Sequence, residues 1–354
     1  MNDNVRYTAE AVSLGHPDKC ADFIASYILD RYLERDPLTK FAVEVLLKGN
    51  TVVLGGEVKS KVSFSTVLLK KFAVEALSEI GYDSRYESLW GENAIEISKI
   101  KLINLIGSQS SEINQGVENG TSDGAILGWG DQGLFMGYAN SFNGGLRKDQ
   151  FYAKRLAYEL YTMALKSEVY GLDIKTQVTL EEDGKIDTVI VAIPTRGETN
   201  FDEVKEIVKS VIPENPDNLI INGTGSYTMH SSIADCGVTG RKLAVDFYSS
   251  SCPVGGGCPW GKDASKADVS LNLYARKLAV ENLADNDECF VYLSSCIGKA
   301  DLPSSYIKTI KNDITTLREF TFDKSPQDVI DDLFLQQPIY ASMCKKSMKG
   351  FMLY

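Results

Sequence analysis

The sequence predicts an α+β fold built from three related units, each a small, mostly antiparallel sheet covered by helices. The main observation is a helix, a two-stranded hairpin and a second helix that occur in this order twice, around the turns at Gly49-Asn50 and Asp183-Gly184. A weaker third copy follows near the C-terminus. The length of 354 residues agrees, because a chain of this size rarely forms one simple core.

The first unit is predicted to begin with a helix over residues 18–34. Pro17 is a good helix opener, and apolar residues follow it at helical spacing. A second helix is predicted over residues 62–80, where Gly81 ends the pattern. The first hairpin lies between these two helices.

The hairpin sequence alternates apolar and polar residues on both sides of its turn. A two-residue turn after Lys48 would pair Glu44 with Gly55 and Ala42 with Glu57. One face of the hairpin is then apolar and belongs to the core. The other face carries Glu44 and Glu57 as near neighbours, which indicates either a site or an ordinary solvated surface.

The second unit is predicted to contain a helix over 149–169, the hairpin at Asp183-Gly184 and a helix over 202–211. The third unit is predicted to contain a helix over 266–283, a strand over 289–297 and a helix over 326–335. We therefore expect an N-terminal domain over 1–104, a connector over 105–133, a central domain over 134–232 and a C-terminal domain over 233–354. The connector is rich in glycine, serine and asparagine. A loop of this length is usually either disordered or a functional lid.

The composition excludes several classes of protein. A net charge of −11 argues against a dedicated nucleic-acid binder, while 44% hydrophobic and 24% charged residues are typical of a soluble globular chain. The sequence has no run that could span a bilayer and no signal-peptide layout at its N-terminus. Its seven cysteines lack zinc-type spacing. We expect reduced thiols and a cytoplasmic location.

The stretch from residue 235 to 270 is the strongest candidate for a functional site. It combines a glycine triplet over 255–257 with four cations and three interleaved acids, namely Arg241, Lys242, Lys262, Lys266, Asp235, Asp263 and Asp268. Ammonium groups and backbone N–H groups suit a polyphosphate, and carboxylates suit a divalent metal bound to it. Residues 256–262 match most of a P-loop, but Asp263 replaces the required hydroxyl and Pro259 lacks an N–H. We reject a P-loop nucleotidase.

Outside this stretch, single residues allow two interpretations each. His16 lies at a loop-to-helix junction and either faces a ligand or lies on a surface loop, and Asp18 either binds metal or favours the helix dipole. Asp131 lies at a turn, and its residues alone favour a simple β-turn over a functional site. Tyr227 is either a base-stacking ring or a packed loop residue. Lys175 is equally an anion ligand or an edge-strand charge.

Eight motifs distributed over the whole chain resolve these alternatives together. They are EAVSLGHPDK, VLGGE, QSSEINQGV, GDQGLFMGYA, DIKTQVT, DCGVTGRKLAVDFY, GGGCPWGKDASKADVS and PIY. In this order they resemble the S-adenosylmethionine synthetase (methionine adenosyltransferase) family. The resemblance implies three α+β domains around a pseudo-threefold axis, an active site between two subunits of a dimer, and possible pairing of dimers into a tetramer.

The resemblance also implies a reaction: methionine sulfur attacks C5′ of ATP and releases tripolyphosphate, which is hydrolysed to pyrophosphate and phosphate. Catalytic positions that match the family are His16, Lys175, Arg241, Lys242, Lys262 and Lys266. Positions that match its nucleotide or methionine contacts are Glu10, Glu57, Gln109, Asp131, Asp173, Tyr227, Asp235 and Ile297. Its metal positions correspond to Asp18 and Asp268 for Mg²⁺, two ions per site, and to Glu44 for K⁺.

Several residues depart from the family pattern. Leu14 replaces the usual Glu, Val254 the usual His or Arg, and Ser226 the usual Arg. CPWGKD stands where AFSGKD is usual, so Pro259 and Trp260 enter the phosphate loop. The C-terminus lacks the usual GHFGR ending. These changes affect nucleotide contacts and subunit contacts rather than the cations.

Two alternatives to the synthetase remain. A binding or regulatory relative would hold nucleotide or methionine without turnover, but it would not need the lysine and aspartate set. A tripolyphosphatase of the same fold would suit the altered phosphate loop. The methionine-side positions Glu57, Gln109 and Asp131 favour the synthetase over that enzyme.

Overall fold

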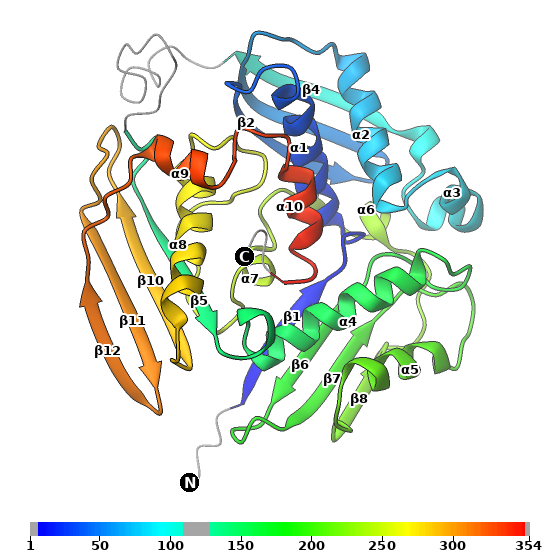
Figure 1. Ribbon diagram of the computed structural model, residues 1–354. Helices are drawn as coiled ribbons and strands as arrows, with labels where there is room; N and C mark the ends of the chain where they lie inside the picture. Colours follow the sequence, from blue (N-terminus) through cyan, green and yellow to red (C-terminus); the bar gives the residue numbers. More distant parts are fainter. Residues whose placement is uncertain (1–5, 109–127, 351–354) are drawn as a thin grey trace.

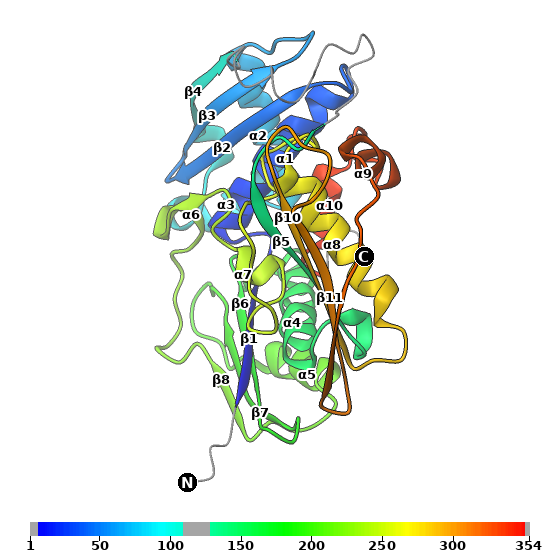
Figure 2. The same cartoon turned by 90° about the vertical axis from the view of Figure 1, so that its left-hand side faces the viewer.

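The structure, a computed structural model, describes residues 6–108 and 128–350 and consists of three four-stranded sheets arranged around a group of helices (Figure 1). The three longest helices of the described chain occupy the middle, and the sheets lie around them. They are α1 (Pro17–Leu33), α4 (Lys148–Ala164) and α8 (Ala267–Leu283). Figure 2 shows the molecule from the side, with β2–β4 at one end and β7 and β8 at the other. The predicted α+β fold is confirmed.

The first sheet has the order β4-β3-β2-β9. Its strands are β2 (Lys40–Lys48), β3 (Thr51–Lys59), β4 (Lys101–Ser108) and β9 (Gly237–Val238), and the helices beside it are α1, α2 (Thr66–Ile80) and α3 (Ser84–Trp90). Two short 3₁₀ turns, η1 (Gly91–Asn93) and η2 (Ile97–Lys99), lead into β4. The predicted pairing of Glu44 with Gly55 and of Ala42 with Glu57 is confirmed. The helix predicted over 62–80 begins later, because Ser65 caps it through the N–H of Leu68.

The second sheet has the order β1-β6-β7-β8 and packs against α4. Its elements are β1 (Tyr7–Val12), β6 (Lys175–Leu180), β7 (Ile186–Ala192), β8 (Asn218–Ile221) and the helix α5 (Asp202–Val211). The hairpin at Asp183-Gly184 and the helix over 202–211 are confirmed. The helix predicted over 149–169 is five residues too long at its C-terminal end, because α4 ends at Ala164.

The third sheet has the order β12-β11-β10-β5 and packs against α8. Its strands are β5 (Gly133–Asn140), β10 (Glu288–Ser295), β11 (Ser304–Lys311) and β12 (Ile314–Glu319). The hairpin of β11 and β12 was not predicted; Asn312 and Asp313 form its turn with φ of 48° and 65°. The helix predicted over 326–335 is α9 (Pro326–Asp332), which stops short because Phe334 has a left-handed backbone at φ 56°.

The sheets exchange strands, so none of them comes from one contiguous segment. β1 precedes the first sheet yet pairs with β6, β5 pairs with β10, and β9 pairs with β2. Each of the expected ranges 1–104, 134–232 and 233–354 therefore supplies most of one sheet and a single strand of another. β4 also runs to Ser108, inside the range assigned to the connector.

Helix α1 is the most buried of the described helices. It packs against α2, β2, β9 and the C-terminal helix α10 (Tyr340–Lys346), and 15 of its 17 residues are buried. Two short helices, α6 (Ser231–Ala234) and α7 (Leu243–Asp246), and the 3₁₀ turn η4 (Asn143–Gly145) complete the described structure. None of the described helices is long and apolar enough to span a membrane. The burial of α1 is important because its first turns carry charged residues.

Candidate active site

The predicted site residues form two groups within one chain. The first, which we name the α1 half-site, surrounds the start of α1 and contains His16, Asp18, Asp173, Lys175, Tyr227, Asp235, Arg241 and Lys242. The second, the glycine-loop half-site, surrounds the start of α8 and contains Glu44, Glu57, Asp131, Lys262, Lys266, Asp268 and Ile297. Among the described residues, no hydrogen bond or ion pair joins one half-site to the other.

His16 is the N-cap of α1, and its Nδ1 accepts the N–H of Asp18 at 3.2 Å. Burial lowers its pKa to about 3, and the charges of Lys242 and Lys175 act in the same direction. The imidazole is therefore neutral. Because Nδ1 accepts, Nε2 carries the proton, and this buried N–H has no hydrogen-bond partner in the described chain. It is a donor available to a ligand oxygen.

Asp18 binds the loop that carries two of the predicted cations. Its Oδ1 accepts the N–H of Val238 at 2.9 Å, and its Oδ2 lies 2.5 Å from Nζ of Lys242. Nε of Arg241 is 3.5 Å from Oδ1. The Asp18 side chain is fully buried, whereas the side chain of Arg241 is half exposed. Asp18 thus fixes the loop but leaves the guanidinium open to a ligand.

Asp173 and Lys175 lie where β6 begins. Burial raises the pKa of Asp173 to about 7, and Lys175 opposes this shift. Oδ2 of Asp173 accepts the N–H of Ser231, while Oδ1 has no partner among the described residues. Asp235 perturbs the pKa of both Asp173 and His16, and burial together with Asp173 raises that of Tyr227. Asp235 therefore lies within electrostatic range of His16 and Asp173, and Asp173 within electrostatic range of Tyr227.

The glycine-loop half-site is built on the edge of β2. Lys262 forms a β-bridge with Ala42, and its Nζ lies 2.5 Å from Oδ2 of Asp268 in the first turn of α8. Both side chains are about one-fifth exposed. Burial disfavours the charge of Lys262, but Asp268 reverses this effect and raises its pKa. The ammonium group of Lys262 therefore stays positively charged on a partly exposed side chain.

The two predicted acids of the hairpin lie beside Lys262. Since Ala42 pairs with Glu57, both Glu44 and Glu57 share the face of the sheet that carries Ala42. Desolvation raises the pKa of Glu44, Lys262 opposes the shift, and Asp268 adds to it. Glu44 therefore lies within electrostatic reach of both members of the ion pair.

The glycine triplet is packed against this half-site. Gly257 has φ of 89°, and a β-carbon there would lie 2.0 Å from Oδ1 of Asp268. A β-carbon on Gly255 would lie 2.1 Å from the carbonyl oxygen of Leu134. Only glycine allows the loop to approach both neighbours.

Asp131 and Ile297 complete the second group. Asp131 is exposed, and its carbonyl accepts the hydroxyl of Ser295 at 2.7 Å. Ile297, which is 53% exposed, forms a β-bridge with Trp129. Gly130 approaches the carbonyl of Ser265, so the turn of Asp131 lies near Lys266. Gln109, the remaining methionine-side prediction, lies outside the described residues.

Glu10 lies apart from both ion-pair networks. It is exposed on β1, where Val12 pairs with Lys175 and Glu10 with Gln177. Paired residues share a face of the sheet, so Glu10 and Lys175 lie on the same face, two positions apart. Among the described groups its only connection to the α1 half-site is this shared face.

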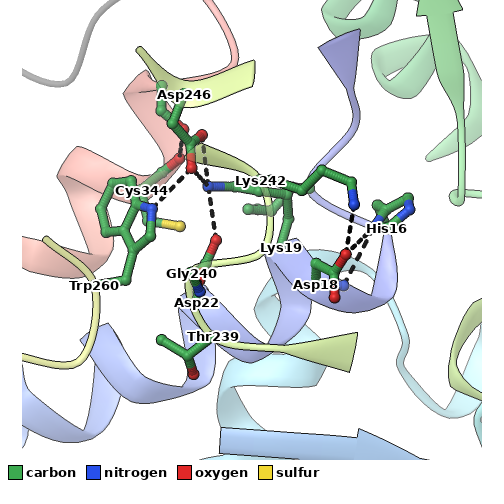
Figure 3. Close-up of polar contacts among 12 residues, drawn as sticks. His16, Asp18, Lys19, Asp22, Thr239, Gly240, Lys242, Asp246, Trp260 and Cys344 are labelled. Atoms are coloured by element: carbon green, nitrogen blue, oxygen red, sulfur yellow. Dashed lines mark hydrogen bonds and ion pairs between the residues drawn. The ribbon is translucent and has the colours of Figure 1, made fainter. Parts of the chain in front are cut away.

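A buried group that the sequence did not predict lies beside the α1 half-site (Figure 3). It consists of Lys19, Asp22, Asp246 and Trp260. Nζ of Lys19 lies 2.8 Å from both carboxylate oxygens of Asp246 and 3.1 Å from Oδ2 of Asp22. The sequence did contain a signal for this group, because the segment DKCAD places charged residues in the first turns of a helix that is otherwise buried. Burial of α1 on all sides was not predictable from its own sequence.

The described residues contain no group of three or more His, Cys, Asp or Glu side chains arranged to hold a metal. Asp18 and Asp268 lie in different half-sites, and each is paired with a lysine. A hard cation such as Mg²⁺ could take one carboxylate from either half-site only if most of its other oxygen ligands came from a phosphate chain or water. The donor type fits Mg²⁺, but the part of the chain that the structure describes holds no preformed cage for it.

Comparisons with known proteins give a uniform result. Two family models match, "S-adenosylmethionine synthetase, N-terminal domain" over residues 4–111 and "S-adenosylmethionine synthetase, C-terminal domain" over residues 229–352. The S-adenosylmethionine synthase of Paramagnetospirillum magneticum is 33% identical over 365 residues, with 96% of this chain and 90% of the relative covered. That of Helicobacter hepaticus is 34% identical over 367 residues, with 96% and 91% covered. The solved structure of an unusual S-adenosylmethionine synthetase from Campylobacter jejuni has a TM-score of 0.85 at 29% identity, with 99% of this chain and 95% of that one covered.

Proposed function

This chain belongs to the S-adenosylmethionine synthetase family, and from that premise we propose which of its residues carry out the reaction. The chain is a methionine adenosyltransferase that forms S-adenosylmethionine from ATP and L-methionine. A sulfur lone pair attacks C5′, the C5′–O5′ bond breaks, and its electron pair leaves with O5′ on the tripolyphosphate. Because a thioether has no proton to lose, the main requirements are orientation and stabilisation of the leaving charge.

The cations of both half-sites are proposed to hold the polyphosphate. The observation that carries this proposal is that Lys242 and Lys262 are each paired with one carboxylate at 2.5 Å while both lysine side chains stay partly exposed. An incoming phosphate oxygen can replace that carboxylate as the partner of the ammonium group. Arg241, Lys175 and Lys266 are partly or fully exposed near these pairs and are proposed to bind the remaining oxygens.

His16 is proposed to donate its Nε2–H to O5′ as the C5′–O5′ bond breaks. The unpartnered, buried N–H and the neutral imidazole support this role. A donor that is already desolvated and oriented needs no reorganisation when charge develops on the oxygen. His16 acts as a hydrogen-bond donor, not as a cation.

Asp18 and Asp268 are proposed to hold Mg²⁺ once their lysines have turned to the phosphate chain. The bound metal would neutralise phosphate charge, and phosphate oxygens would supply most of its ligands. Glu44 is proposed as the K⁺ ligand, since it lies within electrostatic reach of Lys262 and Asp268 on an exposed sheet face. The remaining substrate contacts, proposed from the family positions, are Glu10, Glu57, Gln109, Asp131, Asp173, Tyr227, Asp235 and Ile297.

A complete site is proposed to form between two subunits. The face of the first sheet that carries Glu44 and Glu57 also exposes three large apolar residues, Leu46, Ile103 and Leu105. A second copy packed on this face would cover them and could bring its α1 half-site to the glycine-loop half-site. The seven free thiols support a cytoplasmic location.

The reaction itself is tested by incubating the protein with ATP, methionine, Mg²⁺ and K⁺ and by measuring sulfonium product and phosphate separately. We expect both products. Phosphate without sulfonium would indicate a tripolyphosphatase, and ligand binding without either product would indicate a regulatory relative. Each of these results contradicts the synthetase assignment.

The composite site is tested by co-expressing two inactive variants, Asp18→Asn and Lys262→Met. Random pairing makes about half of the dimers mixed, and each mixed dimer contains one site with both native residues, so about one-quarter of wild-type activity should return. Each variant expressed alone is the matched control. Absence of recovery in verified mixed dimers contradicts a site shared between subunits.

A further inference from the structure

The group Lys19, Asp22, Asp246 and Trp260, which we name the buried node, lies beside Asp18 and Lys242 of the α1 half-site (Figure 3). Its side chains are at most 2% exposed. Lys19 contacts both carboxylates, and its Nζ lies 4.4 Å from the centroid of the Trp260 ring. The indole Nε1–H of Trp260 donates to Oδ2 of Asp246 at 2.8 Å. One ammonium therefore connects two acids and one ring.

On one side the node holds the loop of Arg241 and Lys242. Oδ1 of Asp22 accepts the N–H of Gly240 at 2.8 Å, immediately before Arg241. Asp246 lies in α7, one turn after Lys242, and Lys19 directly follows Asp18 on α1. The node thus contacts the loop before and after its cations.

On the other side the node holds the loop of Lys262 through Trp260, two residues earlier. Gly261 and Asp263 hydrogen-bond to β2, which leaves Lys262 on a short, fixed segment. The two loops also touch directly, since a β-carbon on Gly240 would lie 2.8 Å from Sγ of Cys258. The distance between the cationic loops is therefore set by buried contacts within one chain.

A buried ion pair contributes little net stability compared with apolar residues of the same shape, so stability alone does not explain this group. We propose that Trp260 and Asp246 are positioning residues that act through Lys19 to set the spacing of the Arg241–Lys242 loop and the Lys262 loop. This inference rests on the proposed function, in which both loops bind polyphosphate. Because the two loops of one chain then serve different sites of a dimer, the node connects those two sites.

Trp260→Phe is the test variant, because it keeps an aromatic ring beside Lys19 and removes the N–H that Asp246 accepts. Trp90→Phe is the matched control: Trp90 is also buried, 2% exposed, and its Nε1 has no partner among the described residues. We expect Trp260→Phe to lower kcat about tenfold and to weaken binding of inorganic tripolyphosphate about tenfold, because small displacements of charge-stabilising groups are costly. Trp90→Phe should change neither by more than about twofold.

Asp246→Asn is the second variant, and we expect a larger loss, about a hundredfold in kcat, because Lys19 loses a full charge partner. If this variant does not fold, Trp260→Phe decides alone. Wild-type kcat and tripolyphosphate affinity in Trp260→Phe would overturn the proposal. So would equal losses of kcat in the two tryptophan variants with equal shifts of Tm, since that pattern indicates packing only. Tripolyphosphate binding is measured without methionine, so it tests the node even if the sulfonium product is never formed.

Discussion

Replacing Lys262 by methionine keeps the side-chain stem and removes the charge that lies 2.5 Å from Asp268. Removing one preorganised charge-stabilising donor typically costs a factor of about 100 to 1,000 in kcat, about 3–4 kcal/mol of transition-state stabilisation. Lys262 also pairs with Asp268, a proposed Mg²⁺ position, so its loss disturbs that position as well and we expect the upper part of this range. The ion pair is about one-fifth exposed, and its loss should lower the free energy of unfolding by no more than about 1 kcal/mol. Single-turnover formation of the sulfonium product measures the effect on chemistry.

Lys277→Met is the matched control for this variant. Lys277 forms an ion pair with Glu281 on the same helix as Asp268, and its side chain is 22% exposed against 21% for Lys262. We expect wild-type kcat and a similarly small change in stability. A Lys262→Met enzyme with kcat within a factor of about three of wild type would refute the role assigned to this ammonium group.

Three further predictions concern pH and backbone space. Burial lowers the pKa of His230 to about 4, so on acidification the unfolded chain takes up this proton before the folded chain does. Between pH 7 and 5 the free energy of unfolding of wild type should therefore fall by about 2 kcal/mol more than that of His230→Gln, as measured by urea titrations. Burial raises the pKa of Asp173 to about 7, so the folded chain keeps this proton to a higher pH than the unfolded chain does. From pH 5 to 8 the free energy of unfolding of wild type should fall by about 2–3 kcal/mol relative to that of Asp173→Asn, and an equal pH dependence of the two proteins would contradict the shift. Gly257→Ala should cost at least about 1 kcal/mol in unfolding free energy, because its β-carbon would meet Asp268, whereas Gly256→Ala has no atom within 4 Å and should cost less; equal losses would refute this.

Local patterns predicted the elements well wherever their own residues determined them. The register of the first hairpin followed from alternation around a two-residue turn, and α5 was predicted over its observed range. The β11–β12 hairpin was missed because its strands, a half-buried β11 and an exposed β12, carry mixed polar and apolar residues without clear alternation. Strand exchange was also beyond local reasoning, since nothing in β1 specifies that β6 pairs with it rather than β2.

The arrangement of the candidate site was predicted in part for the same reason. Lys262 and Asp268 lie close in sequence, and the structure brings them together in an ion pair. Their assignment to polyphosphate and to Mg²⁺, respectively, stays a prediction. The neutral state of His16 and its Nε2–H without a partner among the described residues could not be predicted, because both depend on burial by segments far away in the chain. Trp260 was recognised only as a departure from the family pattern. The hydrogen bond from its indole N–H to Asp246 is visible only in the three-dimensional structure.

The exchanged strands have a consequence for the order in which the chain folds during synthesis. β1 cannot pair until β6 has been made, some 160 residues later, and β9 joins β2 later still. Such contacts have a high loop-closure cost and slow the folding of any nascent chain. Until residue 238 emerges, the β2 edge and the first turns of α1 lack the segments that cover them. A truncation that ends before β9 should therefore expose an apolar strand edge and aggregate, whereas the full chain covers it.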